Sequence, residues 1–226
     1  MHNFRSYTIY KAIFSPTYGT AHAASILAEQ LSLNIASEKI QKLDLTFPSA
    51  REIQHYFSDS DLVIAGAPVY GGQLPPVKEL FENLHGNQTP CVLLACYGNR
   101  DYEDALAQLK ALMIRQGFLP VGAIACVIPH VFSEKVGAGR PNVADLSAIS
   151  GFANALKAKF EYDRFEIADV PGNPAPDAKP KKDVPKFLDK SLCTGCGLCA
   201  SSCPTGAIDR GTLSIEKEYW LEDVSG

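Results

Sequence analysis

A chain of 226 residues with 46% hydrophobic and 20% charged residues can form one large domain, or one ordinary domain followed by a small module. Its composition is that of a globular protein, and its formal net charge of -4 excludes a general attraction to nucleic acid or to an anionic membrane. No apolar run approaches the roughly 20 residues that span a bilayer, and the N-terminus has no signal-peptide pattern, so we expect a cytoplasmic protein.

Short apolar runs alternate with amphipathic stretches through the first part of the chain. Several runs are nearly continuous in Val, Ile, Leu, Ala and Cys, which is typical of buried parallel strands. Between them apolar residues recur at helical spacing, and a further helix is predicted from about Val143 to Phe160. We predict strands over Tyr7–Phe14, Lys39–Leu45, Leu62–Ala67, Cys91–Cys96 and Ala123–Ile128. Five strands alternating with helices predict an α/β fold with an open, doubly wound sheet.

The loop after the first predicted strand has the residue types of a phosphate site. In a doubly wound sheet, ligands bind beyond the carboxyl ends of the strands. The loop reads Ser15-Pro16-Thr17-Tyr18-Gly19-Thr20 and leads directly into a helix. Hydroxyls, loop amides and a helix N-terminus suit a phosphate, whereas the alternative interpretation is a simple helix cap. No lysine follows the glycine, so this loop is not a nucleotide P-loop.

Two further loops at strand ends combine an aromatic ring with glycines. The third strand is followed by Pro68-Val69-Tyr70-Gly71, and the fourth ends in Tyr97-Gly98-Asn99-Arg100. Such loops suit a flat ring with polar edges, such as isoalloxazine, stacked on one face and hydrogen-bonded along its rim. Either tyrosine alone would be interpreted as a half-buried surface residue, but the three loops together favour a flavin. A single terminal phosphate, without the dinucleotide fingerprint, favours FMN.

The composition changes after Tyr162. Residues 169–186 contain five prolines and several lysines, which prevent regular helix and favour an extended chain. This segment is interpreted as a linker that is either semi-rigid or laid across the domain surface. We predict an FMN-binding domain over residues 1–165, a linker over 166–188 and a cysteine module over 189–226.

Four of the seven cysteines lie close together near the C-terminus. Their spacing, C-x2-C-x2-C-x3-C-P, is that of bacterial ferredoxins and predicts a 4Fe-4S cluster. The alternative is a structural zinc site, but zinc modules usually have two well-separated ligand pairs. The other three cysteines lie in predicted strands and are interpreted as core residues. The predicted cluster ligands are Cys193, Cys196, Cys199 and Cys203.

Four motifs occur in the order FSPTYGT, GAPVYGGQLP, YGNRDYEDAL and CTGCGLCASSCP. Together they resemble the EFR1-family ferrodoxins, in which a flavodoxin-like domain is fused to a bacterial-type 4Fe-4S ferredoxin domain. The resemblance covers essentially the whole chain and implies a flavodoxin-like five-stranded parallel sheet of order 2-1-3-4-5. It implies that Ser15, Thr17, Gly19 and Thr20 hold the FMN phosphate and that the other two loops hold the ring. Tyr18 is a departure, because flavodoxin loops often have a small residue there.

A second departure is that the family generally has two cysteine motifs, whereas this sequence has one. In two-cluster ferredoxins the fourth cysteine of one motif ligates the other cluster. Three arrangements therefore stay open: Cys203 completes its own cluster, another ligand takes its place, or the chain is a piece of a longer protein. We favour the last and expect a labile cluster.

These features predict electron transfer between FMN and an iron–sulfur cluster, relaying electrons between redox protein partners. No acid–base pair or nucleophile stands out in the sequence. Two alternatives stay open: an FMN-dependent reductase of a small molecule, and a redox-sensing or regulatory module. A protein without bound flavin would favour the regulatory module. Steady turnover of a quinone or nitro compound would favour the reductase.

Overall fold

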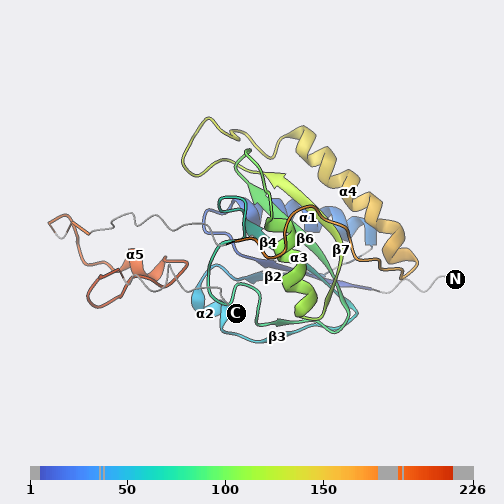
Figure 1. The fold of residues 1–226 in the computed structure, drawn as a ribbon, viewed down its shortest axis with the longest axis horizontal. Helices are drawn as coiled ribbons and strands as arrows, with labels where there is room; N and C mark the ends of the chain where they lie inside the picture. The colour runs from blue at the N-terminus through green and yellow to red at the C-terminus, as the bar shows by residue number, and fades with distance from the viewer. Residues whose placement is uncertain (1–5, 36, 38, 178–187, 190, 216–226) are drawn as a thin grey trace.

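Five parallel strands form the main sheet of the computed structural model, which describes residues 6–35, 37, 39–177, 188–189 and 191–215. All neighbouring strands run parallel, in the order β2-β1-β4-β6-β7 (Figure 1). Numbered by themselves, these strands have the order 2-1-3-4-5, so the fold is the predicted flavodoxin-like doubly wound sheet. The strands are β1 (Thr8–Ile13), β2 (Lys39–Asp44), β4 (Asp61–Pro68), β6 (Thr89–Tyr97) and β7 (Phe118–Val127).

Helices cover both faces of this sheet (Figure 1). Helices α1 (Gly19–Ile35) and α4 (Val143–Glu161) pack on one face, and α3 (Ala105–Arg115) packs on the other. Successive residues of a strand point to opposite faces, so Ile64 joins the α1–α4 core while Val63 joins the α3 core. Burial on both faces explains why β4 and β6 are continuous apolar runs. Over the described residues, no helix combines the length and apolarity needed to cross a membrane.

Four further elements are short. The three that lie within residues 48–85 were not predicted, whereas the sequence predicts a short helix near Ala200, where the structure has a helix that begins at Leu198. Two residues per strand and four per helix are too few for a periodic pattern to emerge from the sequence. The two short strands pair with each other in a separate parallel ladder, and α5 lies among the clustered cysteines. These elements are α2 (Pro48–Arg51), β3 (His55–Tyr56), β5 (Leu84–His85) and α5 (Leu198–Ser201).

Strand β7 begins five residues before its predicted start. The predicted strand begins only at Ala123 because the proline and glycine before it weaken a strand pattern. In the structure β7 lies at an edge of the sheet, where both residues are tolerated. The register shifts between Cys91, which pairs with Pro120, and Val92, which pairs with Gly122. Val121 is therefore the extra residue of a β-bulge.

The Pro-rich segment begins as a strap, residues 168–177, that lies against the domain. The first residue of the strap donates its amide N–H to the Pro120 carbonyl oxygen at 2.7 Å, and Val170 packs against the α3 side of the core. The carbonyl oxygen of its last residue accepts a hydrogen bond from Gln73 Nε2 at 3.1 Å. The strap thus runs from the edge strand β7 to the loop after β4. Of the two predicted states of the linker, these residues adopt the one laid across the surface, and residues 178–187 lie outside the described chain.

Candidate functional site

Three loops leave the carboxyl edge of the sheet, after β1, β4 and β6. The chain winds outward from β1 to β2 and then continues on the other side of β1 with β4, which makes the β1–β4 boundary the topological switch point. The Phe14 N–H donates to the Gly66 carbonyl at 3.0 Å, and the Val69 N–H donates to the Cys96 carbonyl at 2.8 Å. These bonds hold the starts of the loops at one edge, as the sequence predicts.

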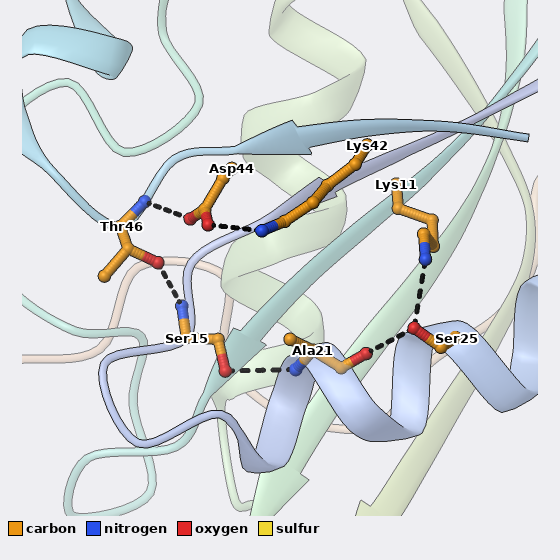
Figure 2. A network of polar contacts seen from close by, with 7 residues as sticks. All are labelled: Lys11, Ser15, Ala21, Ser25, Lys42, Asp44 and Thr46. Carbon is orange, nitrogen blue, oxygen red and sulfur yellow. Dashed lines mark hydrogen bonds and ion pairs between the residues drawn. The ribbon is translucent and has the colours of Figure 1, made fainter.

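The two buried hydroxyls of the β1–α1 loop are already used by the protein. The Ser15 amide donates to Thr46 Oγ1 at 3.1 Å, and Ser15 Oγ accepts from the Ala21 N–H at 3.0 Å (Figure 2). Ser15 therefore caps α1, which is the alternative that the sequence left open. The Thr20 side chain is 1% exposed, and its hydroxyl acts to lower the pKa of the Cys96 thiol, which burial raises. Any phosphate contact by Thr20 would come from its backbone.

The exposed tip of this loop fits a phosphate better. Tyr18 is 81% exposed and has a φ of 63°, so the chain turns sharply there and the bulky side chain points into solvent. Among the described residues, no acceptor is found for the backbone N–H groups of Thr17, Gly19 and Thr20. The Thr17 side chain is exposed. Unpaired amides at the start of a 17-residue helix are the donors that an anion binds.

Thr46, which holds the amide of Ser15, is itself fixed by a charged pair on β2. Its N–H donates to Asp44 Oδ1 at 3.1 Å, and Lys42 Nζ lies 2.9 Å from Asp44 Oδ2 (Figure 2). Partial burial acts to raise the pKa of Asp44, but the hydrogen bonds from Thr46 and Lys42 outweigh it and lower that pKa. Asp44 therefore stays ionised at neutral pH, which keeps the β1–α1 loop in place.

The loop after β4 forms a tight turn that presents a tyrosine. The amides of Tyr70 and Gln73 each donate to the other residue's carbonyl, at 2.9 and 3.2 Å. Tyr70 is 46% exposed, and the neighbouring Gly71 is exposed. Gly72 has a φ of 89° and accepts a hydrogen bond from the Asp104 N–H at 2.8 Å. That bond fastens the turn to the loop after β6, so the two predicted ring loops are in contact.

The loop after β6 begins with a ring contact and a packed glycine. The Tyr97 ring packs edge-on against Tyr102, with centroids 5.7 Å apart, and burial raises the pKa of Tyr97. A Cβ atom on Gly98 would lie 2.3 Å from His130 Cδ2. The glycine at this position is therefore explained by the packing of His130, a partner that the sequence did not indicate.

The remaining predicted ring contacts differ in their exposure. Asn99, with a φ of 62°, and Arg100 are exposed, and Arg100 Nη2 lies 2.6 Å from Glu103 Oε1. Pro68 is buried at the end of β4, and Val69 is half-buried and packs against the α3 side of the core. The exposed residues are the ones whose side chains are open to a ligand.

The four predicted cluster ligands differ in burial. Within the described residues, no group of three or more His, Cys, Asp or Glu side chains is placed to hold a metal ion. The structure therefore does not bring the four thiols around one point. The donor set itself fits an iron–sulfur cluster, because four thiols are spaced along a loop that turns at two glycines with φ of 72° and 71°. Cys193 is half-buried, Cys196 and Cys199 are exposed, and Cys203 is buried.

Hydrogen bonds to the sulfurs of Cys196 and Cys203 favour thiolates, the form in which cysteine ligates metals. The Gly195 N–H donates to Cys193 Sγ at 3.4 Å. The backbone N–H of Leu198 contributes most to lowering the pKa of Cys196. Burial acts to raise the pKa of Cys203, but hydrogen bonds from the side chain and amides that follow it outweigh this and lower the pKa. Amides that stabilise negative sulfur are suited to a cluster.

Comparison with protein families finds a match to the 4Fe-4S binding domain over residues 187–209. All four clustered cysteines fall inside the matched residues. A comparison with curated proteins finds no match.

Solved structures similar to the chain include two flavodoxins and an azoreductase. A flavodoxin from the domain Archaea has 11% identity and a TM-score of 0.42, covering 69% of this chain and 99% of that one. The flavodoxin of Streptococcus pneumonia TIGR4 has 18% identity and a TM-score of 0.42, covering 68% and 98%. The azoreductase of Bacillus anthracis str. Sterne has 14% identity and a TM-score of 0.45, covering 66% and 99%. Because these TM-scores are below 0.5, the fold assignment rests on strand order and register. The chain joins a flavodoxin-like fold to a 4Fe-4S binding domain.

Proposed function

We propose that this chain is an electron-transfer protein that binds FMN at the carboxyl edge of its sheet and a 4Fe-4S cluster through its clustered cysteines. The observation that carries the proposal is the cysteine spacing, because C-x2-C-x2-C-x3-C-P is the bacterial ferredoxin arrangement and lies inside the matched segment. When bound, the two groups supply the redox chemistry, and a flavin and a cluster in one chain suit a relay between redox protein partners.

The β1–α1 loop supports FMN over a dinucleotide. The amides of Thr17, Gly19 and Thr20, which have no acceptor among the described residues, provide donors for one terminal phosphate. The loop lacks the G-x-G-x-x-G fingerprint that places a pyrophosphate on a helix N-terminus. The Asp104 N–H donates to the Gly72 carbonyl and so ties the turn at Tyr70 to the loop after Tyr97, which supports a ring site shared by these two loops.

Replacing Thr17 with alanine is expected to weaken FMN binding by about 1–2 kcal/mol, or roughly 5- to 30-fold, through loss of a hydrogen bond to a charged phosphate. Titration of the cofactor-free protein with FMN, followed by the quenching of flavin fluorescence, measures the dissociation constant. The matched control is Ser32→Ala near the end of the same helix, where the hydroxyl donates only to the Glu29 carbonyl at 2.8 Å. The control should bind FMN like the wild type. Unchanged affinity of Thr17→Ala would remove the phosphate assignment.

We propose that the flavodoxin-like domain extends through the strap to residue 177. A fragment of residues 1–165 lacks the packing of Val170 and the hydrogen bonds that the strap makes to Pro120 and Asp104. Its free energy of unfolding should be about 2–3 kcal/mol below that of a fragment of residues 1–177. Urea denaturation of both fragments measures the difference, and both should bind FMN. Equal unfolding midpoints would show that the strap adds nothing to the domain.

A further inference from the structure

Arg51 is a buried cation surrounded by backbone carbonyls. It ends the short helix α2, and the residue is 3% exposed. Its Nε donates to the Lys78 carbonyl at 2.9 Å, and its Nη1 donates to the carbonyls of Leu45 and Thr46 at 3.0 Å each. The guanidinium carbon lies 5.7 Å from the centroid of the Phe14 ring. Burying a charge is costly unless hydrogen bonds compensate for it, and backbone carbonyls supply these bonds to the Arg51 guanidinium.

The fourth hydrogen bond of Arg51 reaches the cysteine segment. Nη2 donates to the carbonyl of Pro204 at 3.0 Å, across 153 residues of sequence, and Pro204 directly follows the last cysteine. A Cβ atom on Gly206 would lie 3.3 Å from Pro48 Cγ, at the other end of α2. Ala207 is fully buried. The end of the cysteine segment is therefore docked on α2.

The same arginine is linked to the candidate phosphate loop. Thr46, whose carbonyl accepts from Arg51, accepts the Ser15 amide with its side-chain hydroxyl. Figure 2 shows Thr46 and Ser15 in this contact, with Ser15 capping α1. One guanidinium thus bonds both to the residue that fixes the β1–α1 loop and to the residue that follows Cys203.

We propose that Arg51 is a positioning residue that docks residues 203–207 beside the β1–α1 loop. When FMN and the cluster are bound, this docking sets the distance over which an electron passes between the flavin and the cluster. This consequence rests on the proposed function. Only arginine supplies a planar fork of donors that reaches carbonyls on both sides of the contact, because the ammonium of lysine is a compact point charge.

The first test uses the cofactor-free, reduced full chain and needs no activity. The reaction of each cysteine with iodoacetamide is followed by mass spectrometry. In Arg51→Lys, Cys203 should react roughly ten times faster or more, the effect of losing one charged hydrogen bond at the docking contact. The reaction rate of the exposed Cys196 should not change. The control is Arg115→Lys at an exposed residue in the last turn of α3, which should leave both rates unaltered.

A second variant acts from the other side of the contact. Ala207→Glu places a charge at a fully buried position and leaves the Arg51 side chain itself unchanged. It should raise the Cys203 rate similarly and should make the Arg51 guanidinium protons, observed by NMR, exchange faster with solvent. If Arg51→Lys does not fold, this variant decides. Unchanged Cys203 reactivity in a folded Arg51→Lys protein, or unchanged Arg51 exchange in Ala207→Glu, would overturn the proposal.

The second test separates positioning from mere stability. Wild type and Arg51→Lys are reconstituted to equal FMN and iron contents, and a deazaflavin photoreductant supplies one electron in a laser flash. Electron exchange between the flavin and the cluster should be about tenfold slower in Arg51→Lys. An equal rate would overturn the role of Arg51 as a positioning residue. If the wild type itself shows no exchange, the proposed function fails, while cysteine reactivity still decides the docking.

Discussion

Replacing Cys196 with alanine is expected to abolish cluster binding, with iron per chain falling from about four atoms to almost none. Cys196 is exposed, and its pKa is lowered by neighbouring hydrogen bonds, so its thiolate is readily available to iron. FMN binding should persist, because the flavin loops lie on separate elements. Iron and sulfide contents after anaerobic reconstitution, together with flavin content, measure both outcomes.

The matched control is Cys91→Ala. Cys91 is fully buried in β6, and burial raises the pKa of its thiol, so it is a core residue and not a ligand. Its variant should be less stable but should keep its iron. A full complement of iron in Cys196→Ala would contradict the cluster assignment. The variant Cys203→Ala distinguishes the arrangements that the single motif leaves open, because a stable cluster that depends on Cys203 would show that one motif is self-sufficient.

Replacing Gly72 with alanine is expected to damage the flavin site as well as the fold. Gly72 has a φ of 89°, and a Cβ atom there would lie 1.9 Å from Glu103 Oε2 and 2.8 Å from Glu103 Cβ. The backbone strain alone costs about 1–3 kcal/mol. Because Gly72 joins the turn at Tyr70 to the loop after β6, shifting it should weaken FMN binding roughly tenfold or more. Urea denaturation and FMN titration measure the two effects.

A control glycine at the amino ends of the strands separates the effect on flavin binding from the effect on stability. Gly117 precedes β7, has a φ of 82°, and would place a Cβ atom 2.3 Å from the Gly86 carbonyl oxygen. Gly117→Ala should therefore lower the free energy of unfolding at least as much as Gly72→Ala does. FMN affinity of the folded protein should stay at the wild-type value. A similar loss of affinity in both variants would mean that the effect of Gly72 is general destabilisation.

The sheet could be predicted from the sequence because burial on two faces leaves a strong signal. Strands such as β4 and β6 are buried along nearly their whole length, so their residues are apolar without interruption. The helix predicted from Val143 to Phe160 is observed over Val143–Glu161. Strand β7 was only half predicted, since its edge position tolerates a proline that would be costly in a central strand.

The residue types of the candidate site could be predicted from the sequence, but the contacts that these residues make within the protein could not. Thr20 and Gly98 lie in loops with the composition of a ligand site, yet Thr20 is buried in the core and Gly98 makes room for His130. These partners lie far along the chain, so no local pattern could distinguish them from a ligand. Arg51 was missed for the same reason, because the carbonyls that surround it carry no signature in the sequence.

The two outer strands of the sheet are each protected against pairing with a foreign strand. On β7, Pro120 has no N–H to donate, the bulge at Val121 interrupts the ladder, and the strap already occupies the Pro120 carbonyl. On β2, the exposed Lys39 places positive charge along the opposite border, while the exposed Lys42 is paired with Asp44. Unpaired strand edges are the usual templates for amyloid-like assembly and domain swapping. The strap therefore occupies part of the β7 edge, in addition to leading the chain toward the cysteine segment.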